Sequence, residues 1–107
     1  KPARSTRKRN DFMATEPTVV PGKDLGKVML YALSTCGWCK KTKRLLNELG
    51  IAYQYLDLDA LPDEERESVK EVVRRYNPRC NYPTVVINDS ECVVGYDEDK
   101  MKEVLGL

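Results

Sequence analysis

One strand–helix–strand pattern constrains this chain more than any other feature. Residues 28–33 form an uninterrupted apolar run whose length and composition suit a strand that is buried on both faces. Two polar residues follow, and apolar positions then recur at helical spacing through residues 39–49, with Gly50 as the expected helix end. Residues 51–58 alternate as a second strand. The pattern predicts an α/β fold.

The second half of the chain predicts a helix, a hairpin and a final helix. The first of these helices is expected to begin near Pro62, where acidic residues suit the positive end of the helix dipole, and to end at Asn77. Residues 84–87 and 91–94 are typical of an antiparallel hairpin. Apolar positions within 101–105 predict the inward face of the last helix. The predicted order is β-α-β-α-β-β-α.

The length and the distribution of charge predict one domain behind a basic tail. A chain of 107 residues with 41% hydrophobic residues accommodates a single small domain. Residues 1–26 lack a hydrophobic period and contain several prolines and glycines, so we expect a flexible basic and polar tail there and a folded domain over 27–107. Residues 1–9 of this tail contain five lysines and arginines and no acidic residue. This basic stretch has no aromatic interleaving and no recognisable binding module, which argues against binding to nucleic acid.

No apolar segment suits a membrane span or a secretion signal. The longest apolar run has six residues, far fewer than a bilayer requires. The chain is therefore expected to be cytoplasmic and to have no membrane partner.

Cys36 and Cys39 form a Cys-x-x-Cys pair at the predicted junction of the first strand and the first helix. At a helix N-terminus the first sulfur lies near unpaired backbone N–H groups and the positive end of the helix dipole. This environment favours a thiolate, which is the attacking species in disulfide exchange. Cations in the first turns either add to this potential or form a solvated helix face: Lys40, Lys41, Lys43 and Arg44. The pair is predicted to be a redox-active centre.

Three segments resemble a glutaredoxin, or a closely related glutaredoxin-like redoxin, of the thioredoxin superfamily: residues 31–46, 81–88 and 94–98. The resemblance covers residues 27–107 and implies a thioredoxin-like fold, with a mixed four-stranded sheet flanked by helices. In this family the first cysteine is the nucleophile and the second resolves the mixed disulfide. The resemblance therefore assigns these roles to Cys36 and Cys39.

The resemblance also implies the substrate contacts. Pro83 falls where the superfamily has a cis-proline beside the active-site sulfurs, and the backbone of the preceding residue, Tyr82, pairs with substrate. Trp38 is interpreted as a substrate-facing surface, with coverage of the core as the alternative. The remaining expected contacts are Lys40, Arg79, Gly95, Asp97 and Glu98. Asp97 suits a helix N-cap equally well.

Three positions depart from the family pattern. Leu33 stands where a lysine usually meets the glycyl carboxylate of glutathione, which leaves Lys40 and Arg79 as substitutes. Gly37 occupies the place of a proline found in many dithiol glutaredoxins, and Tyr82 replaces a smaller residue.

The predicted function is that of a monomeric dithiol–disulfide oxidoreductase without a tightly bound cofactor or a metal. Its expected substrates are disulfide-containing proteins or small disulfides. The electron donor is glutathione, another low-molecular-weight thiol or a thiol reductase. An alternative from a different class is a module that binds a [2Fe–2S] cluster between two protomers, as implied by glutaredoxins with a small residue after the nucleophile.

Two further cysteines lie outside the predicted redox pair. Cys80 precedes Pro83 by three residues and is expected to approach the active site. Cys92 alternates within a hairpin strand and is expected to be a small buried hydrophobe.

Overall fold

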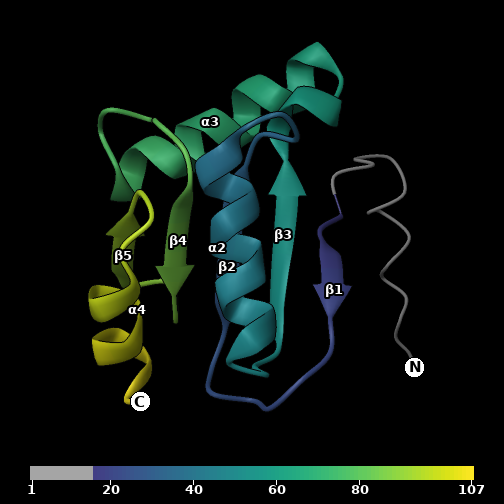
Figure 1. Cartoon of the computed structure of the whole chain (residues 1–107). Coiled ribbons are helices and arrows are strands. Elements are labelled where there is room, and N and C mark those ends of the chain that lie inside the picture. Colours follow the sequence, from purple (N-terminus) through teal and green to yellow (C-terminus); the bar gives the residue numbers. More distant parts are fainter. Residues whose placement is uncertain (1–15) are drawn as a thin grey trace, which may run out of the picture.

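The computed structural model describes residues 16–107 as a five-stranded sheet between helices (Figure 1). The strand order across the sheet is β1-β3-β2-β4-β5. In chain order the elements are β1 (Thr18–Val20), β2 (Val28–Ala32), α2 (Gly37–Glu48), β3 (Tyr53–Asp57), the 3-10 turn η2 (Leu58–Ala60), α3 (Asp63–Tyr76), β4 (Thr84–Ile87), β5 (Glu91–Val94) and α4 (Glu98–Leu105).

Strand β2 is the centre of the sheet and is buried along its whole length, as its apolar run predicts. It runs parallel to β3 and antiparallel to β4, which in turn pairs with β5 as the predicted hairpin. The sheet is therefore mixed, and the predicted β-α-β-α-β-β-α order is confirmed from β2 onward.

The helices cover both faces of the sheet because β2 sends alternate side chains to opposite sides. One core cluster joins Leu30 of β2 to Leu46 of α2 and Met101 of α4. A second cluster on the other face joins Tyr31 to Val73 of α3. Figure 1 shows α2 in front of β2 and α3 running behind the sheet near one end of the strands. This arrangement places the N-terminus of α2 at the end of the central strand.

The sheet has five strands where the sequence predicts four. The additional strand, β1, pairs antiparallel with β3 and lies within residues 1–26, the predicted tail. Downstream of it, Lys23 forms a parallel bridge with Ile51, and a Cβ added to Gly22 would lie 2.5 Å from the Ile51 carbonyl carbon. The ordered fold thus begins before residue 27. The first nine residues, which carry the predicted basic charge, lie outside the described residues.

Smaller differences concern element ends. Helix α2 begins at Gly37, ahead of the predicted start at Cys39, because the cap is Cys36 itself. Helix α3 begins at Asp63, with Pro62 as its N-cap, next to the predicted start. Ile51 precedes β3. None of the described helices is long and apolar enough to span a bilayer.

Candidate active site

Cys36 is the N-cap residue of α2, with an extended backbone at φ −86° and ψ 121°. Its Sγ accepts a hydrogen bond from the backbone N–H of Cys39, with 3.2 Å between the nitrogen and the sulfur. The side chain is half-buried, so it keeps contact with solvent. A backbone N–H and the positive end of the helix dipole therefore face this sulfur, and both stabilise negative charge on it.

Cys39 lies one turn further along α2 and is fully buried in the core. The pKa of the Cys39 thiol is raised to about 12, mainly by burial and in addition by the hydrogen bond and the charge of Cys36. A backbone hydrogen bond from Leu33 and the charge of Lys43 act in the opposite direction. At neutral pH Cys39 is therefore a protonated, inaccessible thiol beside the half-exposed Cys36.

The cations of α2 have different surroundings. Lys43 forms an ion pair with Asp57 at 3.1 Å, and its Nζ lies 4.0 Å from the ring centroid of Tyr55. Lys40 and Arg44 are exposed and have no ion pair within residues 16–107. The charge of Lys43 is therefore neutralised by Asp57, whereas Lys40 and Arg44 form a solvent-exposed basic face of α2.

A carboxylate anchors the turn that leads from β2 to Cys36. Asp59 accepts a hydrogen bond from the Ser34 backbone N–H at 2.9 Å and another from the Ser34 hydroxyl. These two bonds hold the pKa of Asp59 below its usual value of 3.8. The Cys36 N–H donates to the Leu33 carbonyl at 3.2 Å, which closes the same turn. The turn over residues 33–36, called the redox turn below, is therefore hydrogen-bonded to η2 through Ser34 and Asp59.

The loop before Pro83 is organised by the buried amide of Asn77. Its Nδ2 donates to the side-chain oxygen of Asn81 at 2.7 Å and to Thr84 Oγ1 at 2.9 Å. Its Oδ1 accepts from the Arg79 backbone N–H at 3.2 Å. Asn77 is only 4% exposed, so this network fixes the loop from inside the protein. Nothing in the sequence pattern singled it out, because an Asn before a proline is typical of any helix end.

The Tyr82–Pro83 peptide bond is cis, as predicted. Beside it lies a hollow of about 210 Å³ lined by residues from three separate segments. The lining residues are Trp38, Tyr82, Pro83, Gly95 and Tyr96. The structure thus brings together four of the predicted substrate contacts, with Trp38 extending the hollow to the redox turn.

Tyr96 belongs to this site although sequence reasoning did not select it. Its ring stacks on Trp38 with 5.9 Å between centroids and 27° between planes. Lys41 Nζ lies 5.0 Å from the Trp38 centroid and 5.5 Å from that of Tyr96. Trp38 is 58% exposed, so it forms a surface and does not cover the core. The only signal for Tyr96 was an aromatic residue between Gly95 and a helix cap.

The other predicted contacts lie outside the hollow. Asp97 caps α4 by accepting from the Lys100 backbone N–H at 3.0 Å, and Glu98 pairs with Lys102 at 3.1 Å. Arg79 is an exposed residue of the loop before Pro83. Within residues 16–107, neither its side chain nor that of Lys40 forms an ion pair.

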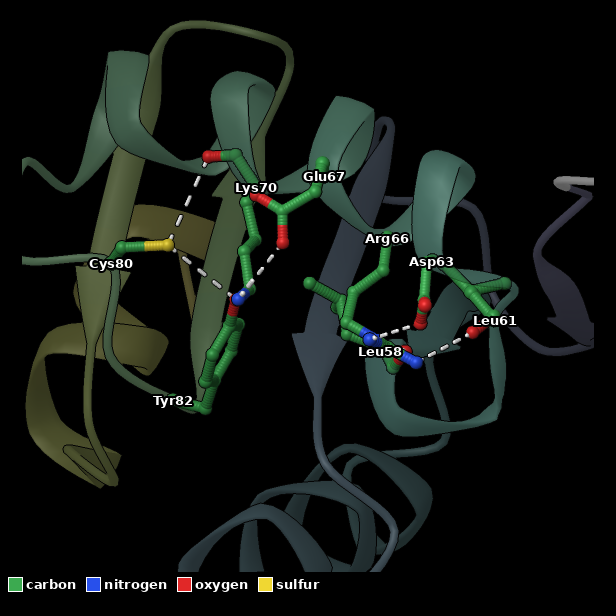
Figure 2. A network of polar contacts seen from close by, with 8 residues as sticks. All are labelled: Leu58, Leu61, Asp63, Arg66, Glu67, Lys70, Cys80 and Tyr82. Carbon is green, nitrogen blue, oxygen red and sulfur yellow. Dashed lines mark hydrogen bonds and ion pairs between the residues drawn. The ribbon is translucent and has the colours of Figure 1, made fainter.

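Cys80 lies against α3 and next to the Tyr82 side chain (Figure 2). Its Sγ lies 3.5 Å from the Tyr82 hydroxyl and 3.8 Å from the carbonyl oxygen of Lys70. Burial and the contact with Cys80 raise the pKa of Tyr82. Cys80 therefore contacts the site through Tyr82, and these contacts do not involve the redox cysteines. Cys92 is half-buried in β5, and this burial raises the pKa of its thiol.

Comparison with known proteins agrees with this geometry. The glutaredoxin family model matches residues 28–92. The crystal structure of the glutaredoxin from Methanosarcina mazei Go1 superimposes with a TM-score of 0.81 and 47% identity, covering 85% of this chain and 88% of that one. Methanoredoxin from Methanosarcina acetivorans gives a TM-score of 0.78 and 44% identity over 80% of this chain and 90% of its own.

A curated relative is more distant in sequence. The uncharacterized glutaredoxin-like 8.6 kDa protein in the rubredoxin operon of Clostridium pasteurianum is 28% identical over 79 residues, which are 73% of this chain and 96% of that protein. The family match includes the redox turn, the proline loop and most of the hairpin. The chain belongs to the glutaredoxin family.

Proposed function

We propose that this protein reduces disulfides by two successive exchange steps at Cys36 and Cys39. The Cys36 thiolate attacks one sulfur of a substrate disulfide and forms a mixed disulfide, and the other substrate sulfur leaves as a thiolate that takes up a proton. Cys39 then loses its proton and attacks the Cys36 sulfur. The Cys36–Cys39 disulfide forms, and the second substrate sulfur leaves. The substrate gains two electrons and two protons, and the protein is oxidised.

The observation that carries this proposal is the contrast between the two thiols. Cys36 is half-exposed and accepts the Cys39 N–H, whereas Cys39 is buried and has a pKa raised to about 12. Two of the causes that raise it are the hydrogen bond and the charge of Cys36. Both disappear once Cys36 is bound in a mixed disulfide. The first step therefore lowers the pKa of Cys39 and prepares the second attack.

Single-turnover reduction tests the proposal without requiring a donor. Pre-reduced protein is mixed with an equimolar symmetrical peptide disulfide, and released thiol is measured. Wild type is expected to reduce the peptide and become oxidised. Cys36→Ser abolishes the reaction, and the matched change Cys92→Ser leaves it intact. Unchanged reduction by Cys36→Ser would contradict the proposal.

The donor is proposed to be glutathione, another small thiol or a thiol reductase. Leu33 is half-buried against the second core cluster and offers no cation to a carboxylate. Lys40 and Arg79 are exposed and free of ion pairs within residues 16–107, so they are available to an anionic thiol. Steady-state rates with each donor at a fixed disulfide concentration identify the donor that reduces the Cys36–Cys39 disulfide again.

The [2Fe–2S] alternative has one favourable observation. A Cβ added to Gly37 would meet nothing within 4 Å, so the space next to the nucleophile is open. Within residues 16–107, however, no three Cys, Asp or Glu side chains gather as ligands. A cluster would therefore need ligands from a second protomer and a small thiol. Iron content and visible absorption after anaerobic purification distinguish the two functions, with Cys36→Ser as the control.

A further inference from the structure

We propose that Asp59 and Arg66 are positioning residues for the exchange at Cys36. They act through a chain of hydrogen bonds that runs from the first turn of α3 through η2 to the redox turn. The inference rests on the proposed exchange at Cys36 and assigns to it two residues that lie outside the redox pair and outside the hollow beside Pro83.

The redox turn is restrained by one carboxylate of η2. The Cys36 N–H donates to the Leu33 carbonyl and closes the turn, so Ser34 is one of its two central residues. The Ser34 backbone N–H donates to Oδ1 of Asp59 at 2.9 Å, and the Ser34 hydroxyl donates to Oδ2. Because one residue binds both oxygens of the carboxylate, these bonds fix the orientation of Ser34 as well as its distance from η2.

The backbone before Cys36 has to be held in place for this sulfur to receive the N–H group of the helix. Cys36 has an extended backbone, and its Sγ accepts the Cys39 N–H across 3.2 Å. Ser34 and Thr35 are exposed, so packing in the core does not fix the middle of the redox turn. The hydrogen bonds to Asp59 supply that restraint two residues before the sulfur. Without them, we expect the sulfur to spend less time in the capping position that favours its charge.

Figure 2 shows how Arg66 of α3 reaches the two ends of η2. Its Nε donates to the Leu58 carbonyl at 3.2 Å, and one terminal nitrogen donates to the Leu61 carbonyl at 3.0 Å. The other terminal nitrogen pairs with Asp63 at 2.9 Å, in the first turn of α3. One guanidinium thus holds the turn that carries Asp59 against the start of α3. The ammonium of a lysine has no planar array of donors and cannot reproduce these contacts.

Asp59 makes its contacts as a carboxylate. The two Ser34 hydrogen bonds, and to a smaller extent the charge of Arg66, hold the pKa of Asp59 below its usual value of 3.8. At neutral pH both oxygens are therefore acceptors. An asparagine here would still accept from the Ser34 N–H, and its amide would donate to the Ser34 hydroxyl, whereas an alanine would do neither. Comparing these two substitutions separates the hydrogen bonds from the charge.

The rate at which iodoacetamide modifies Cys36 at neutral pH tests the role of Asp59, because this small neutral reagent needs no substrate site. Peptide mapping by mass spectrometry follows each cysteine separately. Asp59→Ala is expected to lower the rate constant for Cys36 about three- to tenfold. Asp59→Asn is expected to keep the wild-type rate.

Asp24→Ala is the matched control for Asp59→Ala. Asp24 is also an exposed carboxylate that accepts a backbone N–H, that of Gly26 at 2.9 Å, but it precedes β2 at the end of the strand opposite the redox turn. Its replacement is expected to leave the modification of Cys36 unchanged. A wild-type rate in Asp59→Ala, or an equal fall in Asp59→Asn or Asp24→Ala, would overturn the role of Asp59.

Arg66→Lys and Lys70→Met form a matched pair of variants on α3. The two wild-type side chains are 30% and 32% exposed, and each pairs with an acidic residue three positions earlier. Arg66→Lys keeps the positive charge but loses the donor array that binds η2, so the rate constant for Cys36 is expected to fall about threefold. Lys70→Met is expected to leave it unchanged. A wild-type rate in Arg66→Lys, or the same fall in Lys70→Met, would overturn the role of Arg66.

Single-turnover reduction of a symmetrical peptide disulfide separates this inference from the proposed exchange. Asp59→Ala is expected to lower the limiting rate constant and to leave the half-saturating peptide concentration unchanged, because Asp59 positions the sulfur and does not bind the peptide. If iodoacetamide shows the expected differences but the wild type reduces no disulfide, the exchange function fails and the positioning role stands. If wild type and Asp59→Ala reduce the disulfide at the same rate, or differ in half-saturating concentration alone, the positioning role fails and the exchange stands.

Discussion

The Sγ of Cys36 accepts the backbone N–H of Cys39 across 3.2 Å, so the proposed nucleophile is also the cap of the helix that carries its partner. One hydrogen bond thereby satisfies a donor at the helix start and favours charge on the sulfur. The same geometry keeps Cys39 buried within the core. The two thiols of the pair thus differ in exposure, and burial raises the pKa of the Cys39 thiol.

The first prediction concerns the order of alkylation. Iodoacetamide at neutral pH is expected to modify Cys36 well before Cys39, because Cys39 is buried and burial is the main cause of its raised pKa. Peptide mapping by mass spectrometry measures the order. Replacing the partner, as in Cys36→Ala, removes two causes of the shift and is expected to lower the pKa of Cys39 below about 12. If Cys39 were labelled before Cys36, Cys39 would be the nucleophile and Cys36 the resolving thiol, which contradicts the proposal.

The raised pKa of Cys39 also has a consequence for stability. Its folded-state pKa of about 12 exceeds its ordinary value of 9.0, so the folded protein holds this proton more tightly than the unfolded chain does. The contribution is complete below pH 9 and is lost as the pH rises toward 12. The reduced wild type is therefore expected to lose more stability over this range than Cys39→Ala does.

A second prediction concerns the turn between the cysteines. Gly37 is the first residue of α2, and the backbone of Cys36 already has an extended conformation that suits a residue before proline. Gly37→Pro is expected to raise the free energy of unfolding by about 0.4 to 1 kcal/mol, by restricting the unfolded chain. Gly50→Pro is the contrasting control, because Gly50 has φ +70° and its N–H donates to Asn47. Denaturant titration is expected to show opposite signs for the two variants.

The third prediction concerns the amide that organises the proline loop. Asn77→Ala removes the hydrogen bonds that one buried amide donates to Asn81 and Thr84, and it is expected to cost about 1 to 3 kcal/mol of stability. The KM for peptide disulfides is expected to rise as well, since the loop leads to Tyr82 and Pro83. Arg75→Ala, at an exposed position near the end of α3, is the control. Equal stability of the two variants, measured by chemical denaturation, would show that the Asn77 network is dispensable.

The fourth prediction concerns the donor. Leu33→Lys places a cation where the family usually has one and is expected to lower the KM for glutathione about tenfold. It also removes apolar packing against the second core cluster, so stability is expected to fall by about 1 kcal/mol. Leu61→Lys is the matched control, because Leu61 packs on the same cluster. Its KM for glutathione is expected to stay unchanged, and a KM that falls equally in both variants would contradict the assigned contact.

The central strand and the redox turn could be predicted from the sequence because local pattern determines both. An apolar run of six residues is long enough for a buried strand, and helical spacing after it identifies α2. The position of Cys36 at the helix start follows from these two elements alone. The resemblance to glutaredoxins then predicted that Pro83 is the cis-proline and that Gly95 contacts the substrate.

Features that depend on tertiary contacts could not be predicted in the same way. Strand β1 has three residues between Pro17 and Pro21, so no alternation is visible, and it forms because β3 offers a free edge. The stack of Trp38 on Tyr96 joins positions that lie far apart along the chain. From the sequence, Asp97 suits either a substrate contact or a helix N-cap. In the structure it is the N-cap of α4.

Trapping of a mixed disulfide tests the exchange mechanism most directly. Pre-reduced Cys39→Ser protein is mixed with a peptide disulfide, and the covalent adduct is digested and located by mass spectrometry. The mechanism predicts one peptide attached through Cys36, an adduct that wild type does not accumulate because Cys39 releases it. Attachment through Cys80 or Cys92, or an equal adduct in the wild type, would contradict the assigned nucleophile and resolving thiol.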